Sequence, residues 1–185
     1  GLETLGGIGP KTAQLMSALA ISAPRDILFT LPHSGIDRHR RDSVSDAVLP
    51  EVLTVAITIG SHIPPRTKGG AYRINVQDAG TGFQLVFFHP RGDWIAKNLP
   101  AGARRIVSGR VEVFDGIAQM AHPDHILLPS QADSLPQYEP TYPLTAGLGL
   151  RAMTKAVGAA LDRAPDLAEW ADPSLVLARN WPDWR

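Results

Sequence analysis

Five short segments rich in Val, Ile, Thr and Phe follow one another through the middle of the chain, and they limit the folds open to it. These segments are residues 52–63, 72–80, 83–90, 104–116 and 117–128. β-Branched and aromatic residues in partial alternation are typical of strands. Turn residues separate the segments, with Asp78 to Gly82 between the second and third and Asp115-Gly116 between the fourth and fifth. The sequence therefore predicts a five-stranded sheet in which the last two strands form a hairpin.

A short helical segment interrupts the run of strands. Residues 92–102, GDWIAKNLPAG, have room for one or two helical turns, with Trp94, Ile95 and Leu99 facing inward. Five strands with a helix between the third and fourth is the order of an OB-fold barrel. The predicted fold class is therefore mainly β, a five-stranded OB-fold barrel with flanking α-helices, α+β overall.

Helical patterns flank the barrel on both sides. Apolar spacing predicts helices over residues 10–20 and 24–32 before it, and over 150–164, 167–171 and 173–180 after it. Residues 129–149 are rich in Pro and Gly, which favours an extended linker. We expect three divisions: a helical segment with a glycine turn at 1–45, the barrel at 46–130, and an extended linker with C-terminal helices at 131–185.

Composition excludes several classes of protein. Eighteen basic residues balance eighteen acidic ones, so net charge gives no argument for nucleic acid or membrane. There is no cysteine, which removes disulfides and Cys-based zinc sites. No apolar run approaches the roughly 20 residues of a membrane span. We expect a cytoplasmic protein without membrane partners.

Motifs for catalysis are absent from the sequence. There is no GxxxxGK[ST] segment to hold a nucleoside triphosphate. His122-Pro123-Asp124-His125 places two imidazoles and a carboxylate close together, but no HExxH or carboxylate-rich segment accompanies them, so a strand-end turn is favoured over a metal site. No acid/base pair stands out, and a small hydrolase has no site to support it. We expect no catalytic residue and no cofactor in this chain.

Two adjacent phenylalanines on the third predicted strand indicate binding instead. Phe83, Leu85 and Phe87 share one side at period two, and this apolar side should face the barrel interior. Phe88 then faces outward, where a ring can stack on an unpaired base. The alternative is that both rings belong to the core.

Cations flank these rings along the sequence. Arg66 and Lys68 lie in the loop before the second strand, Arg73 lies on that strand, and Arg91 follows the third. In OB-folds this face binds single-stranded nucleic acid, with basic side chains on the backbone. The plainer interpretation is that the cations are solvated. A protein-interaction module that receives a peptide at the aromatic patch is the other class of function that we consider.

The start of the chain, LGGIGPKTA, has two interpretations. Gly7 and Gly9 can expose backbone N–H groups to a phosphate at a helix start, and Lys11 can reach the same phosphate, as in a helix-hairpin-helix element. Alternatively, Pro10 at the first helical position marks an ordinary helix start.

Several blocks of the sequence together resemble one family. LGGIGPKTAQLMSALAI, RDILFTLPHSGIDR, GTGFQLVFFHPRGDWIAKNLPAG, VSGRVEVFDGIAQMAHPDHI and YPLTAGLGLRAMTKAVGAAL occur in this order over most of residues 5–161. They look like the N-terminal part of the RecG branch-migration DNA helicases. The FF dipeptide, the GxxQMxHP segment and the YPLTxGL segment carry the resemblance.

The resemblance implies that residues 46–130 are a wedge domain that binds replication forks or Holliday junctions and splits the strands in recombination and repair. It implies a stacking role for Phe88. In some relatives a second aromatic lies four residues later, where this chain has Gly92, and Trp94 is the candidate substitute. ATP and Mg²⁺ would belong to a helicase motor that is absent here. The expected partners are branched DNA and single-stranded DNA at the fork, with the protein as a monomer.

Overall fold

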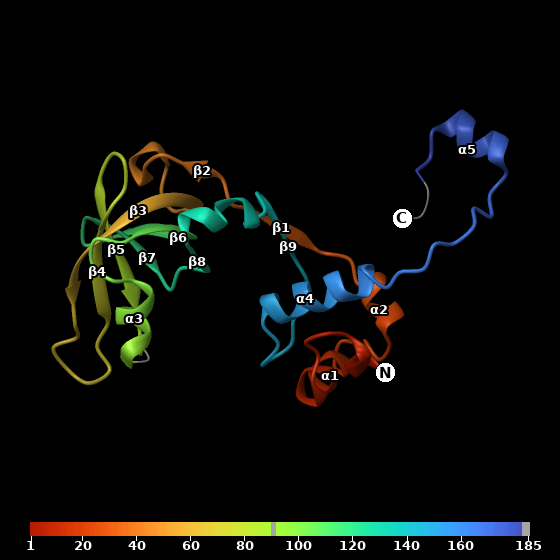
Figure 1. The fold of residues 1–185 in the computed structure, drawn as a ribbon, viewed down its shortest axis with the longest axis horizontal. Helices are drawn as coiled ribbons and strands as arrows, with labels where there is room; N and C mark the ends of the chain where they lie inside the picture. Colours follow the sequence, from red (N-terminus) through yellow and green to blue (C-terminus); the bar gives the residue numbers. More distant parts are fainter. Residues whose placement is uncertain (90–91, 183–185) are drawn as a thin grey trace. The chain divides into compact units, whose positions relative to one another are not determined.

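A computed structural model describes residues 1–89 and 92–182 of the 185-residue chain. Residues Gly35–Glu139 form one compact unit, and Gly1–Ser34 with Pro140–Arg185 form the other. Each unit is considered by itself, and both are drawn in Figure 1.

The first unit is a closed β-barrel. Its strands are β3 (Glu51–Ile63), β4 (Tyr72–Gln77), β5 (Gly82–Phe87), β6 (Arg104–Phe114) and β7 (Ile117–Ala121). They pair in the order β3-β4-β5-β7-β6, and β6 pairs again with β3 to close the barrel. Helix α3 (Gly92–Asn98) lies between β5 and β6 in the chain. This is the OB-fold barrel predicted from the sequence.

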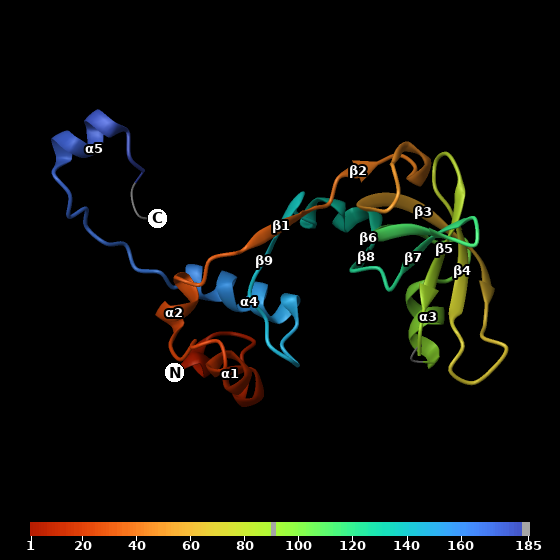
Figure 2. The same cartoon turned by 180° about the vertical axis from the view of Figure 1, so that it is seen from behind.

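The barrel interior is filled by the inward side of each strand. Alternation places Leu53, Val55, Ile57 and Ile59 of β3 inside, and all four are almost fully buried. Ile95 and Leu99 of α3 belong to the same core. The helix and the β3–β4 loop lie toward the same end of the barrel strands, as Figures 1 and 2 show from opposite sides.

The barrel unit, Gly35–Glu139, begins before the predicted limit of 46 and ends after the predicted limit of 130. β2 (Arg40–Arg41), which lies before residue 46, pairs in parallel with β3, and β8 (His125–Leu127), which lies inside the predicted limits, pairs with β6. The segment 117–128 was predicted as one strand, but the structure divides it into β7 and β8, which residues 122–124 separate. Pro123 in this gap has no N–H to give to a ladder.

A buried arginine ties the two ends of this unit together. Arg38 is 3% exposed, and its guanidinium donates to the Asp124 carboxylate at 3.0 Å and to the Ser108 hydroxyl at 3.1 Å. Its Nε donates to Glu139 Oε2 at 2.6 Å. Burial acts to raise the pKa of Glu139, but Arg38 and His125 outweigh it and hold that pKa below its ordinary value. Residues before β2 and after β8 are thus part of the barrel unit.

The turn between β4 and β5 is organised by one carboxylate. Asp78 accepts hydrogen bonds from the backbone N–H groups of Thr81, Val44 and Gly80, at 2.7, 2.8 and 2.9 Å. Burial acts to raise the pKa of Asp78, and these donors together lower it. The turn predicted at 78–82 is therefore held by a largely buried, charged side chain.

The second unit is helical. It contains η1 (Leu2–Thr4), α1 (Pro10–Ser17), α2 (Pro24–Leu28), α4 (Leu150–Leu161) and α5 (Pro173–Arg179). Met16 of α1 and Met153 of α4 are fully buried in one apolar cluster. β1 (Ser34–Asp37) and β9 (Tyr138–Thr141) pair as a separate two-stranded sheet. The barrel unit also contains two short 3-10 helices, η2 (Val44–Asp46) and η3 (Pro129–Ser134).

One predicted helix is wrong. Residues 167–170 have no regular secondary structure, although LAEWA was expected to be helical. Pro165 and Pro173 limit the segment on both sides, and so short a stretch cannot nucleate a helix without packing.

Among the described residues, no helix is long and apolar enough to cross a membrane.

Candidate nucleic-acid interface

The two adjacent phenylalanines lie on opposite sides of the barrel wall. Phe83, Leu85 and Phe87 are 2%, 0% and 7% exposed, whereas Phe88 is 49% exposed. The predicted inward and outward orientations of Phe87 and Phe88 are therefore confirmed. Val86 is on the outward side of the alternation and is nevertheless buried, so the outer surface of β5 is covered at Val86, two residues before Phe88.

The Phe88 ring is held by a histidine distant in sequence. The Phe88 backbone N–H donates to His122 Nε2 at 3.0 Å. The two rings face each other with centroids 5.6 Å apart and planes tilted by 35°. The same imidazole makes an edge contact with Phe87 at 5.9 Å. His122 thus joins the inner ring and the outer ring at the end of β5.

A hollow of about 340 Å³ opens beside these rings, and its lining is mostly apolar. Trp94, which is 45% exposed, lines it from α3 and meets Phe87 edge-on at 6.2 Å. His89, with a backbone φ of 48°, also borders the hollow. The structure therefore brings Phe88 and Trp94 to one site, which we call the aromatic hollow.

The predicted cations lie at different depths. Arg66 and Lys68 are exposed in the loop that leads into β4, whose first residue, Tyr72, pairs with Phe87. The strand pairing therefore starts β4 beside the end of β5 that carries the aromatic hollow. Arg73 pairs with Val86 and is half-buried. Arg91 lies outside the described residues.

The side chains of the HPDH segment, residues 122–125, have separate structural roles. His122 binds the Phe88 amide, Asp124 binds Arg38, and His125 Nε2 lies 3.3 Å from Glu139 Oε2. Within residues 1–89 and 92–182, no three His, Cys, Asp or Glu side chains are grouped to hold a metal ion. The sequence analysis did not predict that His122 belongs to the site. The QMxHP segment drew attention to this histidine, but its hydrogen-bond partner, the Phe88 amide, could not be identified from the sequence.

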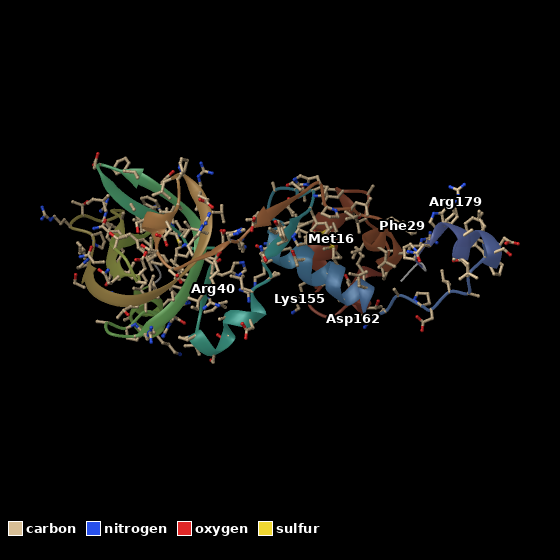
Figure 3. All side chains as sticks on the ribbon, turned by 90° about the horizontal axis from the view of Figure 1, so that it is seen from above. Met16, Phe29, Arg40, Lys155, Asp162 and Arg179 are labelled. Atoms are coloured by element: carbon tan, nitrogen blue, oxygen red, sulfur yellow. The ribbon has the colours of Figure 1, made fainter. Side chains whose placement is uncertain are left out.

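The glycine turn belongs to the helical unit. Gly7 has a φ of +88°, Gly9 is the N-cap of α1, and Lys11 is in the first turn of that helix. Among the described residues, neither glycine amide donates a hydrogen bond. Lys155 of α4, labelled in Figure 3, lies directly over Gly7, with Nζ 2.7 Å from where a Cβ would stand. The turn therefore combines free amides with two lysines.

Comparison with known proteins identifies a family and a structure with a similar fold. The family model described as the RecG wedge domain matches residues 3–163. A structure of RecG bound to a three-way DNA junction aligns over 96% of this chain, with a TM-score of 0.79 and 20% sequence identity. At this identity the likeness establishes the fold. This chain spans 25% of the length of that RecG chain.

Weaker likenesses accompany this one. The second OB-fold domain of replication protein A from Methanococcus maripaludis aligns over half of this chain and 97% of its own length. Its TM-score of 0.38, at 14% identity, is too low to support an argument. A comparison with curated protein sequences gives no significant match.

Proposed function

Because the chain belongs to the RecG wedge-domain family, we propose that it is the branched-DNA-binding wedge of a RecG-like helicase acting in recombination and repair. Its substrates are replication forks and Holliday junctions, with single-stranded DNA exposed where the arms meet. The barrel divides the strands by steric obstruction while a motor moves the duplex.

The exposed ring of Phe88 is the observation that carries this proposal. Nearly half of its surface is open, although the chain buries every neighbouring apolar side chain of β5. Opening one base-pair step costs about 1.4 kcal/mol of DNA stacking. One base stacked on an aromatic ring regains about 1–3 kcal/mol. A ring fixed at the end of a rigid strand can therefore hold the opened position of a fork.

Basic side chains supply the contacts to the DNA backbone in this proposal. Arg66 and Lys68 form no ion pair within the described part of the chain, so both are available to phosphates. Arg73 and Arg91 are assigned the same role. Trp94 supplies a second ring in the aromatic hollow, in the place of the aromatic that some relatives carry four residues after the first.

ATP hydrolysis is assigned to motor domains outside this chain. The sequence has no GxxxxGK[ST] segment to hold a nucleoside triphosphate, and we therefore place ATP and Mg²⁺ with those motor domains. We assign no catalytic step to the chain alone. A monomer in the cytoplasm is the state that we propose for it.

A second candidate function is capture of a peptide. The lining of the aromatic hollow is mostly apolar, which suits a hydrophobic side chain as well as a base. The two functions differ in their dependence on salt, because contacts to phosphates release counterions and contacts to an apolar peptide do not.

Fluorescence anisotropy with labelled fork, duplex and single-stranded DNA tests the proposal. We expect the fork to bind best, with a linear fall of log K against log salt. Phe88→Ala should weaken fork binding by about 1–3 kcal/mol with little change in stability. Phe29→Ala is the matched control, because Phe29 is 78% exposed and lies in the helical unit.

Equal fork affinity for Phe88→Ala and Phe29→Ala, at the same folded fraction, would contradict the assignment of Phe88. Binding that shows no salt dependence would favour the peptide module instead.

A further inference from the structure

A second group of polar side chains lies on the same barrel, away from Phe88. Arg40, Arg41 and Arg104 line a hollow of about 190 Å³, which we call the arginine hollow. Arg40 pairs with Thr54 on one side of β3, and Arg104 pairs with Thr58 on the other side. The hollow reaches the β4–β5 turn, which precedes β5, whereas Phe88 follows the end of β5. The two sites therefore lie toward opposite ends of β5.

The arginines of this hollow are incompletely paired. Within residues 1–89 and 92–182, the side chains of Arg40 and Arg104 form no ion pair and no hydrogen bond. Arg41 donates through Nη2 to Glu51 at 3.1 Å, but its Nε is buried and has no acceptor. Buried N–H groups without a partner are rare in folded proteins. The hollow is therefore lined by guanidinium groups whose N–H donors are not all used.

Two carboxylates, those of Asp42 and Asp78, border the arginine hollow. Asp78 is surrounded by the backbone donors of its own turn, and Glu51, which does not line the hollow, pairs with Arg41. The two unpaired guanidinium groups of Arg40 and Arg104 then outnumber the remaining carboxylate, that of Asp42. Guanidinium groups also match the geometry of phosphate oxygens.

We propose that the arginine hollow binds the phosphodiester backbone of a DNA strand, separate from the strand held at Phe88. This inference rests on the proposed binding of branched DNA, and it assigns a second contact to the barrel. Two arms of one fork can then be held toward opposite ends of β5. Arg40, labelled in Figure 3, and Arg104 provide the charge, and Arg41 lines the same hollow.

The first test is the salt dependence of fork binding by the full chain carrying Arg40→Gln with Arg104→Gln. Each lost phosphate contact lowers the slope of log K against log salt by about 0.7–0.9, so two lower it by about 1.4–1.8. Arg110→Gln is the matched control, because Arg110 is an exposed arginine of β6 that does not line the hollow. Both replaced arginines are exposed, so the melting temperature should stay constant.

The second test does not require DNA. Titration with inorganic phosphate, followed by ¹H–¹⁵N NMR, should shift the Arg41 Nε–H signal in the unmodified chain. The shift should be strongly reduced in the double variant and retained in Arg110→Gln.

The outcomes separate this inference from the proposed function. An unchanged salt slope together with an unmoved Arg41 signal overturns the inference, and the proposed function stands if Phe88→Ala still weakens fork binding. If the unmodified chain binds no fork, the proposed function fails. The phosphate titration then decides by itself whether the hollow binds phosphate groups.

Discussion

The barrel and the helical unit each contain a candidate contact to DNA, and the two are built in different ways. In the barrel, the Phe88 ring depends on His122, which lies 34 residues later in the chain. In the helical unit, Gly7, Gly9 and Lys11 lie within one short turn, and the φ of +88° at Gly7 sets the backbone. Lys155 is then added from a distant helix.

This difference shows how much each candidate site depends on tertiary structure. A glycine turn before a helix can expose its amides through local backbone geometry. An exposed ring at the end of a strand needs the register of the whole sheet and a partner that fixes its position. We therefore expect changes in the barrel core to lower stability strongly, and changes of the lysines at the turn to affect only salt-dependent binding.

The largest effect is expected for Phe87→Ala. Phe87 is 7% exposed in the barrel core, so removing its ring should lower the free energy of unfolding by about 3–5 kcal/mol. Thermal and denaturant unfolding measure this loss. Phe88→Ala, one residue later, should lose far less stability. Equal losses for the two variants would show that the barrel wall does not separate these rings.

An intermediate effect is expected for His122, and it tests whether distant contacts position the ring. His122→Leu removes the acceptor of the Phe88 N–H, and the loss in fork binding should be about 0.5–1.5 kcal/mol, as for one hydrogen bond. His122→Gln retains an acceptor oxygen and should recover part of this affinity. Both replacements face the same backbone φ of 45°, so their strain is matched. Identical affinities for Leu and Gln at this position would argue against a positioning role.

The smallest effect is expected in the glycine turn. Lys11→Gln with Lys155→Gln should lower the salt slope of fork binding by about 0.7–0.9 per lost phosphate contact, with little change in melting temperature. Gly7→Ala is a poor probe, because a side chain there is strained and meets Lys155. Arg151→Gln, an exposed change on the same helix as Lys155, is the control. If the salt slope of fork binding is unchanged in the double lysine variant, the turn is an ordinary helix start and does not contact phosphates.

Much of the barrel could be predicted because short stretches of sequence indicate its strands and turns. Alternating residues in 83–88 separated the inward Phe87 from the outward Phe88, and Asp115-Gly116 located a hairpin. The LAEWA helix was wrong because apolar spacing alone cannot show whether a short segment finds a packing partner. The division of residues 117–128 into two strands was also missed, although Pro123 was visible in the sequence.

The sequence by itself determined the order of strands and helix along the chain that is typical of an OB barrel, the alternation that turns Phe87 and Phe88 to opposite sides, and the glycine turn, since each depends on residues that are near neighbours in the chain. Only the tertiary structure decided that His122 holds Phe88, that Arg38 joins Asp124 to Glu139, and that Arg40 and Arg104 share one hollow. Each of these links joins residues that are 34 to 101 positions apart along the chain. The physical reason is strand pairing. Register between distant strands sets which side chains meet, and one chain's local pattern does not specify that register.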